Sequence, residues 1–413
     1  MNIKTSLLLC TVAYLFSSCE TDICNQTVEY TKATGIYLDI EELRSTPLNA
    51  PIRDIKNAGK IYVAEDFTLI GEEGEGIHVI DTKDATNPQT INFINIPMNH
   101  EFIVHGNSLF AESHYDMLQI DLSDLTNVRL ENRASDYLTS VLTNDEGHRL
   151  IGFETEKVTE KLPCDTDIKA NIVNYIDWKN QLIPPSTVPS SFAGNSAGAT
   201  ATLNKSALSN NYLYCVTDED LHVFQATSDL TKVNTLEQFS SGMETILIRE
   251  KEAFFGKMDG MTIADLSDPV QPRAIKEYRH ERTCDPVLPH NDVAYVTLRA
   301  EDCGGSVNLL DVIDLTSNST QLSALERIEM DSPFGMAIIN ETLFVGEGTN
   351  GLKTFDIRNE RTPILTNWFQ DVEAYDVMLH PNGQMLLVTG SDGLNTYSLD
   401  QTQSLTFLSN VAY

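Results

Sequence analysis

A segment of about 40 residues recurs along this chain, and each copy contains a short apolar run closed by turn residues. Clear copies are GIHVIDTKDATNP (76–88), DMLQIDLSDLTNV (116–128), GMTIADLSDPVQP (260–272) and GLKTFDIRNERTP (351–363). A fixed period of this length indicates a repeat architecture in which each copy is one supersecondary unit. The repeat, and not the length of 413 residues, therefore decides the number of domains.

The copies align on the position that Asp81 occupies, which we call the anchor position. Its occupants are Asp81, Asp121, Asp177, Gln225, Asp265, Asp314, Asp356 and Ser398. The unit is thus 40 residues long and is repeated eight times, with insertions. Five positions before the anchor stand residues that tolerate a positive φ, which predicts a tight hairpin there: Gly76, Asp116, Asp220, Gly260, Gly351 and Gly393.

The run before each anchor is apolar on both faces of a strand. The positions four and one before the anchor, such as Ile77 and Ile80, are apolar in every copy and point to opposite faces. Such a strand must be covered on both sides. Two further strands precede it, as in EFIVHGN and SLFAES, and a fourth follows, as in VRLENRA.

These four antiparallel strands per unit predict an all-β fold, a β-propeller of four-stranded blades. We expect eight blades, with seven as the alternative. A β-helix would have a shorter period, and tandem β-sandwiches a longer one. We expect the ring to be closed by the segment 28–40 or by the C-terminal strand near Leu405.

The N-terminus, MNIKTSLLLCTVAYLFSSCE, has the form of an export signal, because its apolar run is too short to span a bilayer. Its small-small-Cys ending resembles the lipobox of bacterial lipoproteins, which implies cleavage after residue 18 and lipidation of Cys19. The alternative is an ordinary secretory signal with an incidental cysteine. We therefore divide the chain into a signal peptide (1–18), a tether and N-terminal extension (19–50) and a propeller domain (51–413).

Several segments resemble the LVIVD-repeat family of bacterial lipoprotein propellers. They are GKIYV, GEGIHVID, NPQ, DLSDPVQP, CDPV, AYVTLR and CGG, and the resemblance runs from about residue 50 to the end of the chain. It implies a propeller in the cell envelope, and it brings no settled activity with it. Glu20 and Asp22 resemble the signal that takes lipoproteins of the Bacteroidetes to the outer face of the outer membrane, which implies a location on the cell surface.

The charge of the chain limits its partners. Without residues 1–18, which contain Lys4, 27 basic residues remain against 60 acidic ones, a net charge of −33. Nucleic acid is excluded as a natural partner, because phosphate contacts need clustered Lys and Arg. We expect the bilayer to be a partner through the lipid anchor, with a glycan or an envelope protein as ligand, and we expect a monomer.

The sequence contains no zinc-protease, P-loop or calcium-loop motif. No HExxH or P-loop pattern occurs, and the acidic runs GEEGEG and DED lack the ligand spacing of a calcium loop. The letters of GxSxG and GxGxxG each occur, as GNSAG (194–198) and GEGTNG (346–351). We predict no metal, no cofactor and no identifiable catalytic residue. The first hypothesis is a non-enzymatic binding module tethered to a membrane. The alternatives are an extracellular hydrolase or lyase acting on a polysaccharide, and a structural partner in an envelope complex.

Insertions indicate which face of the ring is used. With the strands of a blade named A to D from the axis outward, the B–C and D–A connections share one face. The insertions VTEKLPCDTDIKAN (158–171) and AEDCGGSVN (300–308) both precede a C strand, so we place them in B–C loops. Because loops on a rigid scaffold carry binding sites, that face is the predicted functional surface. Neutral drift in tolerant loops is the alternative.

Five thiols remain if Cys19 is lipidated: Cys24, Cys164, Cys215, Cys284 and Cys303. Cys284 and Cys303 fall on the same face of one blade, and we predict that they form a disulfide that contributes about 3 kcal/mol. Cys215, in YLYCV, is expected to be a small buried side chain. Pairing of Cys24 with Cys164 stays open, and no CxxC pair supports a metal site.

One basic stretch interrupts this acidic chain. KEYRHERTCDPV (276–287) lies near the predicted disulfide, and arginine binds carboxylate or sulfate through two parallel hydrogen bonds. The candidate ligand-binding residues, for an acidic glycan or an acidic protein loop, are Arg279, His280, Arg282 and Arg299. The alternative is an outer strand that uses charge to block edge pairing and is neutralised by Glu277 and Glu281.

Overall fold

The computed structural model describes residues 25–137, 143–163, 192–193, 199–201, 205–217, 220–227, 229–239, 242–257, 259–281, 286–300, 306–400 and 402–413. The chain forms two compact units, one of Met1–Gly35 with Phe153–Ile176 and one of Ile36–Gly152 with Asp177–Tyr413. In the first unit, β1 (Asn25–Leu38) and β11 (Arg149–Pro163) form a two-stranded ribbon. No helix in the described ranges has the length and apolar character needed to cross a membrane.

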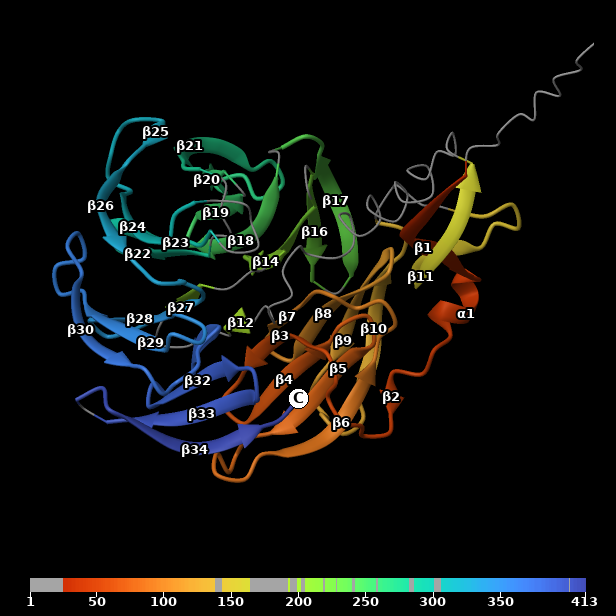
Figure 1. The fold of residues 1–413 in the computed structure, drawn as a ribbon, viewed down its shortest axis with the longest axis horizontal. Helices are drawn as coiled ribbons and strands as arrows, with labels where there is room; N and C mark the ends of the chain where they lie inside the picture. The colour runs from red at the N-terminus through yellow and green to blue at the C-terminus, as the bar shows by residue number, and fades with distance from the viewer. Residues whose placement is uncertain are drawn as a thin grey trace, which may run out of the picture. The chain divides into compact units, whose positions relative to one another are not determined.

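The second unit is a β-propeller, and its described residues form seven antiparallel four-stranded blades around a central axis (Figure 1). Blade 1 consists of β3 (Ala58–Val63), β4 (Phe67–Glu72), β5 (Gly76–Asp81) and β6 (Gln89–Asn95). Blade 2 consists of β7 (Phe102–His105), β8 (Ser108–Ser113), β9 (Asp116–Asp121) and β10 (Arg129–Ala134). Blade 3 consists of β14 (Ser206–Ser209), β15 (Tyr212–Val216), β16 (Leu221–Ala226) and β17 (Leu230–Leu236). In each blade the strands run A to D from the axis outward in chain order.

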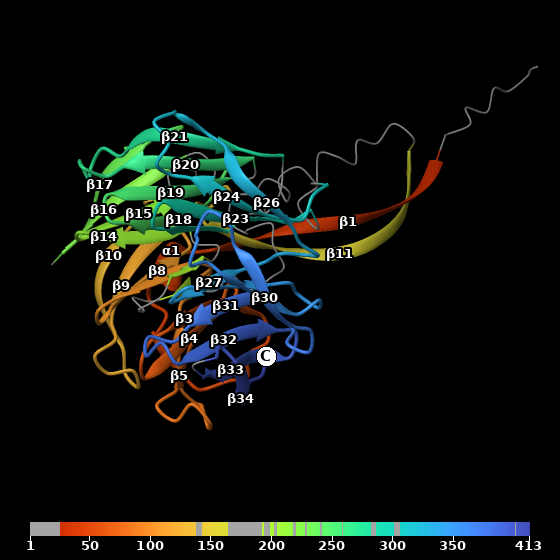
Figure 2. The ribbon, with the colours of Figure 1, turned by 90° about the vertical axis from the view of Figure 1, so that its left-hand side faces the viewer.

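The remaining four blades repeat this order. Blade 4 consists of β18 (Met243–Arg249), β19 (Glu252–Lys257), β20 (Gly260–Asp265) and β21 (Arg273–Arg279), and blade 5 of β22 (Val287–His290), β23 (Val293–Leu298), β24 (Leu309–Asp314) and β26 (Ala324–Glu329). Blade 6 consists of β27 (Met336–Ile339), β28 (Thr342–Gly346), β29 (Leu352–Asp356) and β30 (Ile364–Phe369). Blade 7 consists of β31 (Asp376–Leu379), β32 (Met385–Gly390), β33 (Gly393–Leu399) and β34 (Leu405–Val411). Figure 2 shows the same blades after a turn of 90°.

Short strands extend some blades at their edges. At the outer edges, β2 (Asn49–Ala50) pairs with β6, and β25 (Gln321–Leu322) pairs with β21. At the inner edges, β12 (Phe192–Ala193) pairs with β3, and β13 (Ala199–Ala201) pairs with β27. A single short helix, α1 (Ile40–Arg44), occurs among the described residues, and its N-cap Asp39 accepts a hydrogen bond of 2.7 Å from the Glu41 amide.

The prediction of eight blades is wrong, because the described residues form seven. Leu118 of blade 2 and Leu213 of blade 3 belong to one buried core, and the inner strands β7 and β14 are neighbours. Direct packing of these two blades leaves no place between them for a blade anchored on Asp177, which itself lies outside the described residues. The other seven anchors all stand at or next to the end of a C strand.

The ring closes through side-chain packing between blades 1 and 7, without an exchanged strand. β34 is simply the outer strand of blade 7, and the segment 28–40 contributes to β1 and α1 instead of a blade. Ile61 and Met378 share a buried core across this junction. Two polar contacts also connect blade 7 with blade 1. His380 Nε2 lies 3.1 Å from the Glu65 carbonyl, and Ser409 Oγ donates to the Ala85 carbonyl at 2.6 Å.

The recurrent anchor aspartate has a local structural reason. Asp121 Oδ1 accepts the Ser123 amide at 2.9 Å, which turns the chain from the C strand toward the D strand. The same contact recurs at Asp81, Asp265, Asp314 and Asp356. Hydrogen bonds from Ser123 also lower the pKa of Asp121, which keeps the turn-forming carboxylate ionised.

Glycine is required at the start of several C strands because a Cβ would not fit there and because the backbone has a positive φ. Gly260 has a φ of 155°, and a Cβ there would lie 2.1 Å from the Tyr278 carbonyl oxygen on the neighbouring D strand. The prediction of a positive φ is confirmed at Gly76, Gly260, Gly351 and Gly393. At Asp116 and Asp220 the backbone does not adopt it.

We expect Gly260→Ala to lower the free energy of unfolding by about 1–3 kcal/mol, because the new methyl group adds a clash to a strained backbone. Gly106→Ala is the control, since Gly106 also has a positive φ, of 57°, but its added Cβ would meet no described atom within 4 Å. Urea denaturation of both variants measures the difference. Equal losses would show that the contact with Tyr278 is unimportant.

Candidate functional site

The two faces of the ring differ in their connections. On one face, which we call the turn face, lie the short A–B connections and the C–D connections, most of which are seven residues long. Asn210 and Asn211, for example, form an A–B turn with φ of 49° and 64°, and the C–D turns are closed by the anchor aspartates. On the other face, which we call the loop face, the B–C and D–A connections include the longer segments.

The predicted location of the insertions is partly confirmed. Residues 300–308 connect β23 with β24 and are therefore a B–C loop. The segment 158–171 was assigned to a B–C loop of an additional blade, and this is wrong: it belongs to the connection between β10 and β14, which is a D–A connection. Both connections leave from the loop face, so the face itself was predicted correctly.

A buried polar position lies three residues before the anchor, close to the loop face where each C strand begins. We call its occupants the polar layer. They are His78, His222, Thr262, Asp311, Lys353 and Asn395, all buried, while blade 2 has Leu118. This position was not predicted from the sequence, because the strand prediction rests on the apolar positions on either side of it. The aligned copies contain the signal, since a polar residue recurs there in six of the seven blades.

In blade 6 the polar layer includes an ion-pair triad in which Lys353 and Glu347 are buried and Asp331 is exposed. Lys353 Nζ lies 2.7 Å from Asp331 Oδ2 and 2.8 Å from Glu347 Oε1, and the Glu347 side chain is fully buried. Glu347 Oε2 also accepts the Asp331 amide at 3.1 Å. Burial alone would lower the pKa of Lys353, but the hydrogen bonds to Asp331 and Glu347 raise it overall. The ammonium thus remains charged and ties a D–A connection to the end of a B strand.

In blade 1 the same position holds a histidine. His78 Nε2 lies 2.9 Å from Glu72 Oε2, and Arg53 Nη2 reaches the same oxygen at 2.9 Å. The Arg53 guanidinium also lies 4.0 Å from the centre of the Phe93 ring. Burial lowers the pKa of His78, and the attraction of Glu72 opposes this only in part. A neutral imidazole that donates Nε2–H to Glu72 follows from this arrangement.

In blade 5 a buried carboxyl meets a tyrosine of the preceding blade. The Tyr278 hydroxyl donates to Asp311 Oδ2, and Arg327 Nε lies 3.6 Å from Asp311 Oδ1. Burial raises the pKa of Asp311, although these partners oppose it. Burial also raises the pKa of Tyr278. The His280 ring centre lies 5.6 Å from that of Tyr278, so this cluster adjoins the predicted basic stretch.

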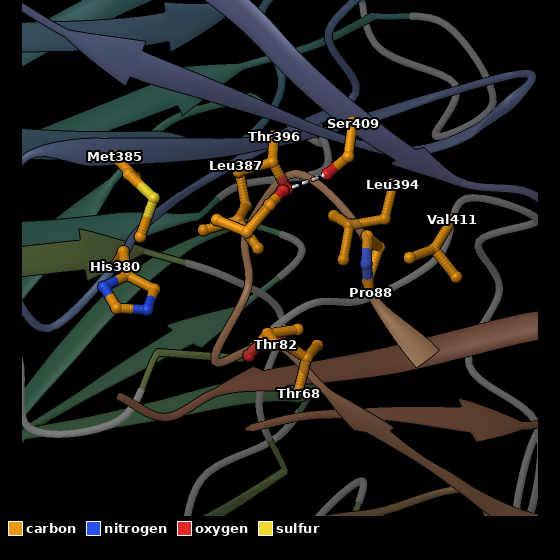
Figure 3. Close-up of a pocket in the computed structure, with 11 residues that line it drawn as sticks. Thr68, Thr82, Pro88, His380, Met385, Leu387, Leu394, Thr396, Ser409 and Val411 are labelled. Atoms are coloured by element: carbon orange, nitrogen blue, oxygen red, sulfur yellow. Dashed lines mark hydrogen bonds between the residues drawn. The ribbon is translucent and has the colours of Figure 1, made fainter. Parts of the chain in front are cut away.

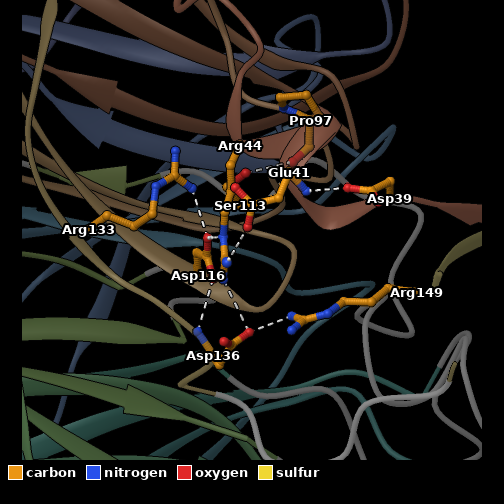
Figure 4. Close-up of polar contacts among 9 residues, drawn as sticks. All are labelled: Asp39, Glu41, Arg44, Pro97, Ser113, Asp116, Arg133, Asp136 and Arg149. Atoms are coloured by element: carbon orange, nitrogen blue, oxygen red, sulfur yellow. Dashed lines mark hydrogen bonds and ion pairs between the residues drawn. The ribbon is translucent and has the colours of Figure 1, made fainter. Parts of the chain in front are cut away.

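Blade 2 carries the largest described ion-pair network (Figure 4). Asp116 is fully buried and lies 2.9 Å from Arg44 Nε and 2.8 Å from Arg133 Nη1. It also accepts the Asp136 amide at 3.0 Å, and the Asp136 carboxylate pairs in turn with Arg149. Burial would raise the pKa of Asp116, but hydrogen bonds from these groups lower it overall. The network fastens α1, which ends in Arg44, to the loop face of blade 2.

The predicted ligand-binding residues occupy different environments. Arg279 is exposed and pairs with Glu277 at 3.2 Å, as the alternative interpretation expected. His280 is half-buried, with Nδ1 2.6 Å from the Glu281 carbonyl. Arg299 is buried, with its guanidinium 4.2 Å from the centre of the Phe334 ring, and Arg282 lies outside the described residues. Ligand binding by these residues stays a prediction.

Of the cysteines, the structure describes Cys215, which is free and buried as expected. Burial raises the pKa of its thiol, so it is a poor nucleophile. Cys19, Cys24, Cys164, Cys284 and Cys303 lie outside the described residues. Lipidation of Cys19 and the disulfide between Cys284 and Cys303 therefore stay predictions.

A small cavity of about 20 Å³ lies between blades 1 and 7 (Figure 3). Its walls include Thr68, Thr82, His380 and Leu394, and no carboxylate is among the residues that line it. It has room for about one water molecule. It therefore does not offer the pair of carboxylates that glycoside hydrolysis needs. Within the described residues, no three His, Cys, Asp or Glu side chains gather in a way that would hold a metal ion.

Comparison with known proteins supports the fold alone. No protein-family model and no curated protein matches the chain. Among solved structures, a proposed 6-phosphogluconolactonase from Bacteroides fragilis matches with a TM-score of 0.54 and 11% identity, over 86% of this chain and 94% of its own. A protein of unknown function from Desulfotomaculum acetoxidans matches with a TM-score of 0.53 and 9% identity, over 84% and 96%. The mitotic checkpoint complex matches with a TM-score of 0.50 and 10% identity, over 100% of both chains.

Proposed function

We propose that this protein is a binding module anchored to a membrane by lipid and that it holds its ligand or partner on the loop face. One observation carries this proposal, namely the difference between the two faces. The two long insertions, in the connections 299–308 and 135–205, both leave from the loop face, and charged side chains that are already fixed in ion pairs lie on it. Groups held in place before a ligand arrives lose little conformational entropy on binding.

The proposed lipid anchor rests on the sequence of the N-terminus. We propose that the chain is an LVIVD-repeat lipoprotein, lipidated at Cys19 and displayed on the outer membrane of a Gram-negative bacterium. The propeller fold is consistent with this, and the contact of Arg44 with Asp116 fixes the later part of the extension 19–50 to blade 2. A lipid at Cys19 would then hold the whole propeller near the bilayer.

We expect Cys19→Ala to move the protein from the membrane fraction to the soluble fraction, because a lipidated N-terminus needs that thiol. Cys24→Ala is the matched control and should stay with the membranes. Cell fractionation, together with the mass of the N-terminal peptide, measures both results. Membrane association that survives Cys19→Ala would contradict the proposed anchor.

The ligand that fits the basic stretch is acidic, such as a uronate-bearing glycan or an acidic loop of an envelope protein. We expect the double variant Arg279→Glu, Arg282→Glu to weaken binding at least about tenfold, since hydrogen bonds to charged groups contribute about 1.5–3 kcal/mol. Lys83→Glu on the turn face is the control. A glycan array and a pull-down compare the three proteins. Equal binding by all of them would remove this stretch from the proposed surface.

A further inference from the structure

The outer strand of blade 6 exposes an apolar edge. In β30, Ile364 is 64% exposed, Leu365 51% and Trp368 39%, and the strand is the last of its sheet. Single exposed apolar residues are common on protein surfaces. An edge strand with three of them is not protected against pairing with another strand. An edge of this kind is a template to which a further strand adds through main-chain hydrogen bonds.

None of the other described outer strands combines an uncovered edge, no charge and several exposed apolar side chains. β6 and β21 are covered by β2 and β25, which shows that outer edges of this propeller accept a fifth strand. β10, β17 and β26 carry charged residues: Arg129, Glu131, Arg133, Lys232, Glu326, Arg327 and Glu329. β34 has no charge, but Phe407 is its only large apolar side chain that is exposed. β30 combines an uncovered edge with no charge and three exposed apolar side chains.

We propose that β30 pairs antiparallel with β30 of a second copy of this chain across a two-fold axis. The register with β29 sets Ile364 opposite Asp356 and Phe369 opposite Leu352, on one face of the sheet. Leu365 and Trp368 lie on the other face, because a bulge at Thr366 shifts the alternation.

A two-fold axis that passes between Thr366 and Asn367 therefore sets apolar side chains opposite one another on both faces of the sheet. It places Leu365 opposite Trp368 of the second copy, and Ile364 opposite Phe369 of the second copy. Pairs of an aliphatic and an aromatic side chain stabilise antiparallel strands. A two-fold interface needs a self-complementary patch of this kind.

The charges near the two ends of β30 do not assist this pairing. Arg358 and Arg361, before the strand, already pair with Asp356 and Asp314 of their own chain, and Asp371 and Glu373 follow the strand. The apolar pairs must therefore outweigh the repulsion between two chains that each carry a formal net charge of −32.

Analytical ultracentrifugation of the purified protein up to about 100 µM tests the proposal. We expect a monomer–dimer equilibrium, and we expect Leu365→Lys to raise the dimer Kd at least about tenfold, because the change enters the interface twice. Val233→Lys is the control, since Val233 is an exposed residue on the outer strand β17 of blade 3. Thermal unfolding verifies that both variants fold.

A wild-type chain that stays monomeric over the whole concentration range would overturn the proposal. So would dimerisation of Leu365→Lys at the wild-type Kd, or an equal loss in Val233→Lys. The expected result would replace the monomer expected from the sequence with a symmetric dimer.

Discussion

Asp116→Ala should destabilise the propeller by about 3–5 kcal/mol, because it leaves the guanidinium groups of Arg44 and Arg133 without their buried counter-charge. The loss should also release α1, so proteolysis near Arg44 should become faster than in the wild type. Chemical denaturation and limited proteolysis measure the two effects. Asp136→Ala is the control, since its side chain is 47% exposed and its pairs with Arg44 and Arg149 contribute about 0–1 kcal/mol.

The same network predicts a dependence on pH. The pKa of Asp116 is lowered in the folded protein, so the folded state binds fewer protons at this site than the unfolded chain. Its contribution to stability is present above the unfolded value of about 4 and is lost as pH falls through the folded value. Asp116→Ala should therefore be less sensitive than the wild type to acid as the pH falls below about 4. An unchanged acid profile, or a loss below about 1 kcal/mol at pH 7, would contradict the role of Asp116.

Glu347→Ala should cost a similar 3–5 kcal/mol or so, through a different mechanism. It leaves the Lys353 ammonium with Asp331 as its remaining partner in the triad, and it removes the acceptor of the Asp331 and Ser332 amides. Unsatisfied buried donors of this kind are expensive. Denaturation measured on the single variant gives the size of the effect.

The double variant Glu347→Leu, Lys353→Met separates the charge from the packing. Removing both charges should recover part of the loss, because no unpaired ion is left in the blade. The pKa of Lys353 is raised in the folded state, so its contribution is fully present below the unfolded value of about 10.4 and is lost only as pH rises through the folded value. A double variant that is less stable than Glu347→Ala would show that packing, and not charge, decides this site.

The fold was predictable because each blade repeats a local pattern. The apolar positions around each anchor and the turn that each anchor aspartate closes depend on residues within one blade, as in Asp121 with Ser123. The number of blades was not predictable in the same way. The sequence around Asp177 matches the apolar positions of the repeat, and only the packing of Leu118 with Leu213 shows that blades 2 and 3 are direct neighbours.

The face that carries the insertions was predictable, and the buried polar contacts were not. Insertions indicate where a ring tolerates extra chain, and their position relative to the C strands placed them on the loop face, whose role in binding stays a proposal. The buried contacts of Asp311 and Asp116 depend on partners far away in the sequence. Asp311 meets Tyr278 of the preceding blade, and Asp116 meets Arg44 of the N-terminal segment. A linear pattern contains neither pairing, because both arise from the order of the blades around the axis and from the course of the N-terminal segment.

The claim that the loop face is the binding surface is tested most directly by photo-crosslinking in intact cells. A photoreactive amino acid is placed at Glu237 or Asp259 on the loop face, and at Lys83 or Asn107 on the turn face, all of which are exposed. We expect the same crosslinked partner or glycan from both loop-face positions, and none from the turn face. Crosslinks that arise equally from Lys83 and Asn107, or from them alone, would contradict the account.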